Sequence, residues 1–272
     1  MEIKMKKIIA LTLILSCIFT MAACAGNGTD DGGKTETSAE TTAVTNADIA
    51  KAGNGDDAKS EGVMTYSEYV AAEIDTPVVI EAFVQAKQSW WEDKATVYAQ
   101  DSEGGYFIYN MECFEEDYAK LVPGTKIKVT GYKAEWSGEV EIAEGATFEI
   151  ENDSSFIAEA TDVTAILGTE DLIKNQNKFV SFKGLKIEAY NENGDAFSYK
   201  WDGSGSEGDD LYFKASVGDT SYTFTVESYL CDKDSEVYSA VKNLKVGDVV
   251  DMEGFLYWYE EPCPHITAVT VK

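Results

Sequence analysis

Arginine is absent from this chain. All 22 basic residues are lysines, set against 49 acidic residues and a formal net charge of -27. Arginine grips phosphate through two parallel hydrogen bonds, and proteins that bind nucleic acid draw most of their affinity from basic side chains. Because so acidic a chain would repel a phosphate backbone, the composition predicts that nucleic acid is not a partner.

Histidine and cysteine are also scarce. His265 is the only histidine, so a multi-histidine zinc site is excluded, and a nucleophile–histidine pair would have to use this residue. We expect His265 to be a partly exposed strand-edge residue, because it follows a turn. Three of the five cysteines lie beyond the N-terminal region, and an odd number argues against a disulfide framework. Cys231 and Cys263 could form one pair, and free thiols packed as small apolar side chains are the alternative.

Long apolar runs are missing as well. The apolar stretch from Ile8 to Thr20 is shorter than the ~20 residues needed to span a bilayer. With the lysines before it and the small residues after it, residues 1–23 have the pattern of a secretory signal peptide. Cys24 directly follows two alanines, an arrangement that resembles the lipobox of bacterial lipoproteins. The resemblance implies cleavage before Cys24, a palmitate-bearing lipid anchor on its sulfur, and an extracytoplasmic protein held at the cell membrane. The lysine-only, acidic composition together with the signal peptide suggests a Gram-positive bacterium as the source.

Aromatic residues are absent from residues 25–62, which are rich in glycine, threonine and aspartate. Such a composition cannot bury enough apolar surface to offset the conformational entropy of the chain. We therefore expect residues 24–62 to form a lipidated, disordered tether, whose flexible part would have a root-mean-square span of roughly 35 Å.

From residue 63 onward the sequence contains two degenerate copies of one pattern. Each copy has the order strand, strand, strand, helix, strand, strand, with helices expected near residues 113–120 and 235–244. The copies predict two domains, residues 63–158 and 159–272. The shared motif consists of Leu121, Gly124 and Gly131 in the first copy and Leu244, Gly247 and Gly254 in the second.

This order and this motif resemble the OB-fold, a five-stranded Greek-key barrel found in the nucleic-acid-binding-like superfamily. The chain as a whole resembles tandem OB-fold lipoproteins of clostridial bacteria. The resemblance implies an all-β fold with short helices, in which two tandem OB-fold barrels follow the tether. It implies little about function, because this barrel hosts many unrelated activities.

All five tryptophans fall in the connections between strands 1 and 2 or strands 4 and 5, where OB barrels usually bind ligands. Their flat rings suit sugar faces, apolar ligands and cations. The alternative is that the rings cap the barrel ends or pack the two barrels together. The candidate ligand-binding residues are Trp90, Trp91 and Trp136 in the first copy and Trp201, Tyr257, Trp258 and Tyr259 in the second.

No pattern marks a catalytic site. The sequence has no nucleophile elbow, phosphate loop or metal-ligand motif, and no pair of acids stands out as a hydrolytic pair. Asp202, Asp209 and Asp210 lie in a glycine-rich loop of the kind that calcium prefers, although their spacing does not fit an EF-hand. A solvated acidic loop is the alternative. We therefore expect no enzymatic activity and no resident cofactor other than this candidate calcium.

The leading hypothesis is a membrane-anchored, extracytoplasmic module that binds a glycan, a small molecule or a protein through its loop aromatics. The alternative is a structural or scaffolding lipoprotein of the cell envelope that binds a protein partner. A hydrolase is a third and weaker hypothesis.

Overall fold

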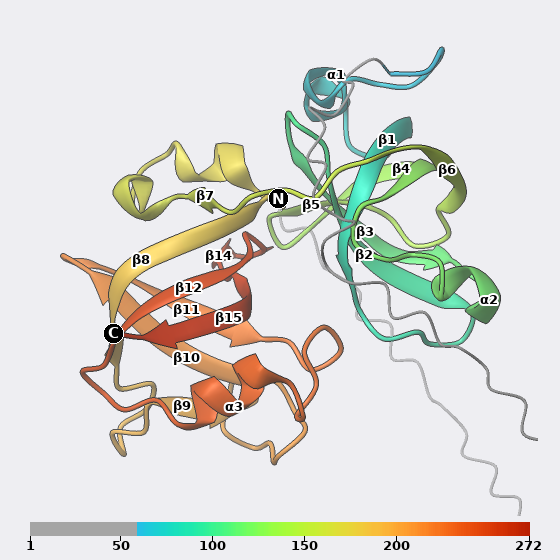
Figure 1. Cartoon of the computed structure of the whole chain (residues 1–272). Coiled ribbons are helices and arrows are strands. Elements are labelled where there is room, and N and C mark those ends of the chain that lie inside the picture. Colours follow the sequence, from blue (N-terminus) through green and yellow to red (C-terminus); the bar gives the residue numbers. More distant parts are fainter. Residues whose placement is uncertain (1–58) are drawn as a thin grey trace, which may run out of the picture. The chain divides into compact units, whose positions relative to one another are not determined.

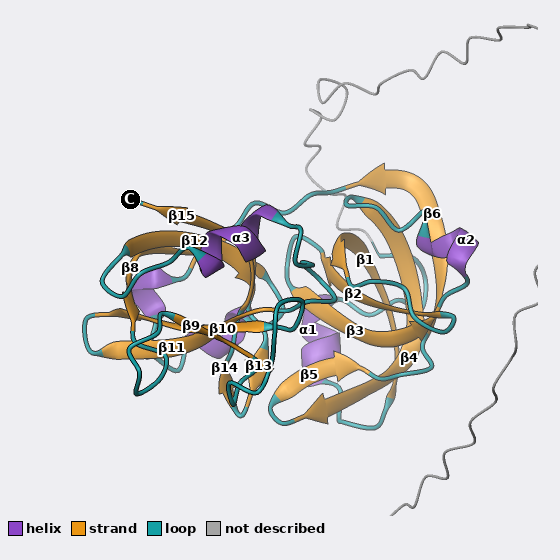
Figure 2. Ribbon diagram, turned by 90° about the horizontal axis from the view of Figure 1, so that it is seen from below, coloured by secondary structure: helices purple, strands orange, loops and turns teal. Residues whose placement is uncertain are grey.

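Strands dominate the computed structural model, which describes residues 59–272. The predicted signal peptide, Cys24 and the linker as far as residue 58 lie outside the described residues. The described residues all belong to one unit of the chain, which contains two barrels and a few short helices (Figures 1 and 2).

The first barrel is preceded by α1 (Tyr66–Ala71) and carries α2 (Glu115–Tyr118) between its third and fourth strands. Its sheet runs in the order β1-β2-β3-β5-β4, and β1 also pairs with β4, which closes the barrel. β6 continues along β4 beyond the end of β5. The strands are β1 (Pro77–Lys87), β2 (Lys94–Gln100), β3 (Gly105–Glu112), β4 (Thr125–Trp136), β5 (Glu139–Ile142) and β6 (Thr147–Ser155).

The second barrel repeats this plan with α3 (Glu236–Lys242) between its third and fourth strands. Its five main strands are β8 (Phe179–Glu188), β10 (Leu211–Val217), β11 (Thr220–Val226), β12 (Val249–Phe255) and β15 (His265–Val271). They run in the order β8-β12-β15-β11-β10, and β8 also pairs with β10. The short elements around them are β7 (Thr161–Asp162), η1 (Thr164–Ile166), η2 (Leu172–Asn175), β9 (Phe197–Tyr199), β13 (Trp258–Tyr259) and β14 (Glu261–Pro262).

Both barrels have the OB-fold topology. In each, the third strand pairs in parallel with the fifth, and the remaining neighbours of the closed ring are antiparallel. The predicted all-β class with two tandem five-stranded Greek-key barrels is therefore confirmed.

The two glycines of the repeated motif have separate structural reasons. Gly124 and Gly247 have φ angles of +89° and +97°, a region that favours glycine, and each turns the chain just before the fourth strand begins. At the second position the strands approach too closely for a side chain. A Cβ on Gly131 would lie 2.7 Å from the Ile142 side chain, and one on Gly254 would lie 2.2 Å from the His265 carbonyl oxygen.

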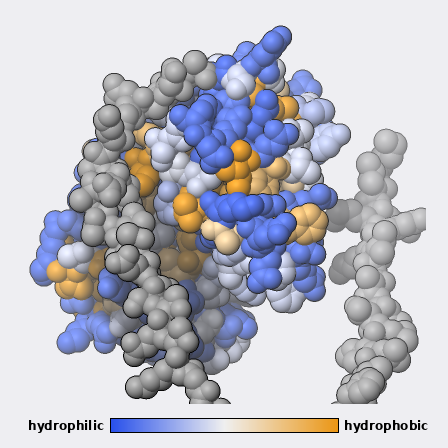
Figure 3. Space-filling model, turned by 45° about the vertical axis from the view of Figure 1, so that its right-hand side comes forward, coloured by the Kyte–Doolittle hydropathy of each residue, from blue (hydrophilic) through white to orange (hydrophobic). Residues whose placement is uncertain are grey.

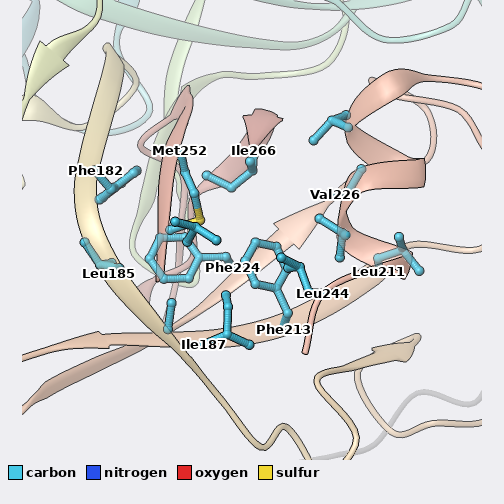
Figure 4. Close-up of a cluster of buried hydrophobic side chains, with 14 of the residues drawn as sticks. Phe182, Leu185, Ile187, Leu211, Phe213, Phe224, Val226, Leu244, Met252 and Ile266 are labelled. Atoms are coloured by element: carbon cyan, nitrogen blue, oxygen red, sulfur yellow. The ribbon is translucent and has the colours of Figure 1, made fainter. Parts of the chain in front are cut away.

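Each barrel has its own hydrophobic core, because the inward-facing residues of its strands alternate with outward-facing ones. In the second barrel, Phe182, Phe213 and Phe224 are fully buried (Figure 4). The Phe224 ring stacks on Phe213 and meets Phe182 edge to face. Cys113, Cys231 and Cys263 are free thiols, so the suggested pair between Cys231 and Cys263 is not formed. The Cys263 thiol instead lies 3.3 Å from the Thr225 hydroxyl.

The face of the surface drawn in Figure 3 is mostly hydrophilic, with hydrophobic side chains in small groups. This agrees with the high share of charged residues in the sequence. Within residues 59–272, no helix has the length and apolar character needed to cross a bilayer.

Candidate functional site

The seven candidate aromatic residues divide into an exposed group and a packed group. Trp91, Trp136, Trp201 and Tyr259 have 65%, 54%, 72% and 47% of their surface exposed. Trp90, Tyr257 and Trp258 are partly buried. The exposed group is accessible to a ligand, whereas the packed group holds loops and barrels in place.

The packed residues each have a clear structural partner. The Trp90 indole N–H donates to the Cys113 carbonyl at 2.9 Å, which ties the β1–β2 connection to the end of β3. The Tyr257 ring stacks on the His265 imidazole, with centroids 4.2 Å apart and planes 21° apart. Trp258 packs against the core of the second barrel. Packing, the alternative role considered for these rings, therefore accounts for three of the seven.

Two of the exposed rings come from corresponding hairpins of the two barrels and lie side by side. Trp136 ends β4 in the first barrel, and Tyr259 lies in β13 in the second, so each belongs to the connection between the fourth and fifth strands of its barrel. Their ring centroids are 5.2 Å apart and their planes are tilted by 47°. Together they form an aromatic pair with about half of each ring exposed, which we call the Trp136–Tyr259 pair.

Main-chain contacts hold these two hairpins together. Ser137 and Gly138 turn the first hairpin with φ angles of 52° and 90°, and two consecutive positive φ angles are typical of a two-residue hairpin turn. The Glu260 N–H donates to the Ser137 carbonyl across the hairpins at 2.6 Å. A Cβ on Gly138 would lie 3.0 Å from the Trp258 ring, so only a glycine leaves room for that ring without adjustment.

Beneath the hairpins lies Glu139, a carboxyl group with no exposed surface. Its Oε2 accepts hydrogen bonds from the Trp258 main-chain N–H at 2.8 Å and from the Gln176 side-chain amide at 3.2 Å. Burial raises the pKa of Glu139 well above 4.5, and the nearby Glu141 carboxylate acts in the same direction. Burial therefore favours the protonated form of Glu139, and the hydrogen bond from the Trp258 N–H connects β5 of the first barrel to the second barrel.

Two more buried carboxyls flank the contact between the barrels. Burial raises the pKa of Glu141 on β5 to about 7. Burial, reinforced by the Asp210 carboxylate, raises the pKa of Glu227 to about 7, although Glu227 accepts from the main-chain N–H groups of Tyr229 and Leu230. This region therefore changes its charge near neutral pH.

His265 is buried, with 8% of its surface exposed, and the expectation that it would be partly exposed at a strand edge is wrong. Its Nδ1 lies 2.6 Å from the Tyr98 hydroxyl of the first barrel. Burial lowers the pKa of His265 from 6.5 to about 3, so the imidazole is neutral. The reason for the difference is the contact between the barrels, which covers a position that would be exposed on an isolated second barrel.

The acidic loop offers no metal centre. Asp202 accepts from the N–H and the hydroxyl of Ser204, and Asp210 accepts from the N–H and the hydroxyl of Ser228. Asp209 accepts from the Ser206 N–H and pairs with a lysine. No group of three or more histidine, cysteine or acidic side chains within residues 59–272 is arranged to hold a metal ion. The candidate calcium site therefore has no geometric support.

Sequence reasoning did not single out Tyr98, Glu139, Glu141 or Glu227. Glu139 and Glu141 alternate with apolar residues, and this pattern is typical of a strand with an exposed polar face. No local signal distinguishes them from ordinary surface acids, because their burial depends on the neighbouring barrel.

Comparison with known proteins gives no family for the chain. No protein-family model and no curated protein matches it, so its resemblance to clostridial lipoproteins stays a prediction. Among solved structures, it is similar to HIN domains, which are OB-fold proteins.

Three of these structures illustrate the extent of the likeness. The Ifi202 HINa domain in complex with 20-base-pair double-stranded DNA is 12% identical, with a TM-score of 0.32, over 73% of this chain and 96% of that chain. A murine DNA-binding protein bound to double-stranded DNA is 10% identical, with a TM-score of 0.31, over 72% and 97%. The p204 HINb domain is 13% identical, with a TM-score of 0.31, over 73% and 98%. A likeness this distant concerns the fold alone.

These neighbours contradict the expectation that nucleic acid is not a partner, since two of them are structures of DNA complexes. The net charge of the whole chain was not sufficient to exclude nucleic acid as a partner, so the expectation was wrong. Binding to phosphate depends on the groups at one surface, and lysine can supply a point charge there without arginine. The exclusion is therefore withdrawn, and at this level of similarity the DNA complexes remain a property of those proteins.

Proposed function

We propose that this chain is a membrane-anchored, extracytoplasmic binding module that takes its ligand on exposed loop aromatics. The observation that carries the proposal is the Trp136–Tyr259 pair, in which corresponding hairpins of the two barrels present adjacent, half-exposed rings. Large rings are costly to leave in water, and two such rings side by side offer an angled apolar platform for a sugar face or another apolar surface. A glycan is therefore the first ligand class to test.

The binding test uses the full chain in detergent on an array of envelope glycans. We expect Trp136→Ala and Tyr259→Ala each to weaken binding by about tenfold, because each removes one large apolar contact. Tyr229→Ala is the matched control, since Tyr229 is 66% exposed and lies outside the pair. If no glycan is retained, or if all three variants bind like the parent, the platform is not the ligand site.

The proposed anchor has a separate test. In cells supplied with labelled palmitate, we expect the label on the parent chain and on Cys17→Ser, but not on Cys24→Ser. Cys24 directly follows the two alanines of the lipobox-like pattern, whereas Cys17 lies within the apolar run. Label on Cys24→Ser would overturn Cys24 as the attachment site without affecting the binding proposal.

A scaffolding role is the second candidate. It is favoured by Tyr257 and Trp258, which pack inside the protein rather than toward solvent and thereby fix the two barrels as one body. Two barrels packed together in this way suit a spacer that holds a partner protein near the membrane. Cross-linking in cells would favour this role if it captured one stoichiometric partner whose capture survived loss of the Trp136–Tyr259 pair.

A further inference from the structure

Strand β6 has one edge without a partner. Within the described part of the chain, β6 pairs only with β4, with Glu151 opposite Lys126 and Phe148 opposite Val129. Apart from this pairing with β4, no main-chain hydrogen bond joins residues 147–155 to another part of residues 59–272. Such an edge presents unpaired N–H and C=O groups that can pair with another extended chain.

A groove of about 970 Å³ borders this strand and is lined by β6, α2 and the β1–β2 turn. Figure 2 shows β6 beside α2, and residues of both elements line the groove. Phe148 and Ile150 from β6 pack against the core of the first barrel and line the groove. Phe114 and Val122, which also line it, are 66% and 52% exposed. The groove therefore offers apolar contacts beside a strand edge that is free to pair.

The acidic side chains that line the groove favour a positively charged occupant. Its two lysines are already paired, Lys94 with Glu144 and Lys120 with Asp117. Three acids on its lining, Glu92, Asp93 and Glu112, take part in none of the ion pairs formed within residues 59–272. An occupant with positive charge would supply the missing partners for these acids.

The acids of β6 itself disfavour pairing between two copies of this chain. β6 carries Glu149, Glu151 and Asp153. The single Lys126 is shared by Glu151, Asp153 and Glu81, so β6 keeps an excess of negative charge, and two β6 edges in register would place acids opposite acids. Acidic edge strands are one of the ways in which proteins avoid pairing with themselves. The edge is thus protected against its own copies but open to a cationic chain.

We propose that the groove beside β6 binds an extended, cationic segment of a partner protein, which adds as a strand to the free edge of β6. Main-chain hydrogen bonds to β6 supply register, and apolar side chains of the segment enter the groove against Phe114 and Ile150. Lysine or arginine side chains of the segment face Glu92, Asp93 and Glu112. This site lies on the first barrel alone and is independent of the Trp136–Tyr259 pair.

The probe is a short peptide of alternating lysine and valine with blocked ends, titrated calorimetrically into the full chain in detergent. We expect it to bind, with an affinity that falls as salt is raised, and we expect its glutamate–valine counterpart not to bind. A version with N-methyl groups on alternate main-chain nitrogens should lose binding, because it cannot donate to the strand edge. Equal binding of the N-methylated peptide would overturn strand addition, and no binding of any peptide would overturn the site.

Variants of the chain locate the site. We expect Phe114→Ala to weaken binding about tenfold through the lost apolar contact. Combined Glu92→Gln and Asp93→Asn should weaken it about fivefold and flatten its salt dependence. The matched control replaces two exposed acids of α2 that do not line the groove, Glu115→Gln with Glu116→Gln, and should bind like the parent. If the control weakens binding as much as the groove variants do, the net charge of the chain explains the loss of binding, and the proposal is overturned.

Two direct readouts complete the test. Amide resonances of residues 147–155 should shift on addition of the peptide, and their exchange with solvent should slow as new hydrogen bonds form. The chain without peptide should remain monomeric as its concentration is raised. Self-association that protects residues 147–155 would assign the edge to a second copy and overturn the cationic partner.

Discussion

The buried Glu139 carboxyl makes the stability of this protein depend on pH in a defined direction. Because its pKa is raised in the folded protein, the folded state holds a proton that the unfolded chain releases above about pH 4.5. Stability from this group is therefore complete below that pH and is lost as pH rises toward the folded-state pKa. Glu141 and Glu227, with pKa values raised to about 7, act in the same direction.

The magnitude follows from the linkage relation. One proton difference changes the free energy of unfolding by about 1.4 kcal/mol per pH unit, so Glu139 alone accounts for at most about 3 kcal/mol between pH ~5 and ~7. His265 acts in the opposite direction below its usual pKa of 6.5, because its folded-state pKa is lowered. A comparison of variants isolates Glu139 from these other groups.

Glu139→Gln is the informative substitution. Glutamine keeps an acceptor for the Trp258 N–H and carries no proton to lose, so the variant should lie within about 1 kcal/mol of the parent near pH 5. Near pH 7 it should be the more stable of the two by up to about 3 kcal/mol. Glu139→Ala instead leaves the Trp258 N–H without its acceptor and opens a cavity. It should lower the free energy of unfolding by about 3 kcal/mol near pH 5.

The assay is urea unfolding of the full chain in detergent, followed by tryptophan fluorescence at several pH values between about 5 and 8. Glu149→Gln is the matched control, because it removes the same formal charge from an exposed position on β6 that forms no ion pair within residues 59–272. It should follow the pH profile of the parent. If the difference between Glu139→Gln and the parent is the same at both ends of the range, Glu139 is not protonated in the folded protein and the reasoning fails.

Three further predictions concern the barrels. Phe213→Ala should lower the free energy of unfolding by about 4 kcal/mol, since it empties a fully buried site in the core, and calorimetry measures this. Gly254→Ala should be strongly destabilising because its Cβ would lie 2.2 Å from a carbonyl oxygen, and circular dichroism during heating would refute this if the melting temperature did not change. Acrylamide should quench the fluorescence of Trp91 much more strongly than that of Trp258, because Trp91 is exposed and Trp258 is packed against the core. The contribution of each ring is obtained by comparing the parent with Trp91→Phe and with Trp258→Phe.

The sequence predicted the barrels because the information they need is local. Strand alternation, turn residues and the recurrence of Leu121, Gly124 and Gly131 in the second copy determine the order of elements, and that order closes into the same barrel twice. It also placed the aromatic candidates in the right connections. Which of those rings would be packed was left open, since both roles use the same residue type.

Only the tertiary structure decided what lies between the barrels. Glu139 and Trp258 are 119 residues apart, and Tyr98 and His265 are 167 residues apart, yet each pair is joined by a hydrogen bond. Period-two alternation tells which side of a strand faces its own core but not whether another barrel covers the opposite side. The burial of a glutamate and the sole histidine, and the meeting of Trp136 with Tyr259, therefore arise from the docking of two units that each fold on a local pattern.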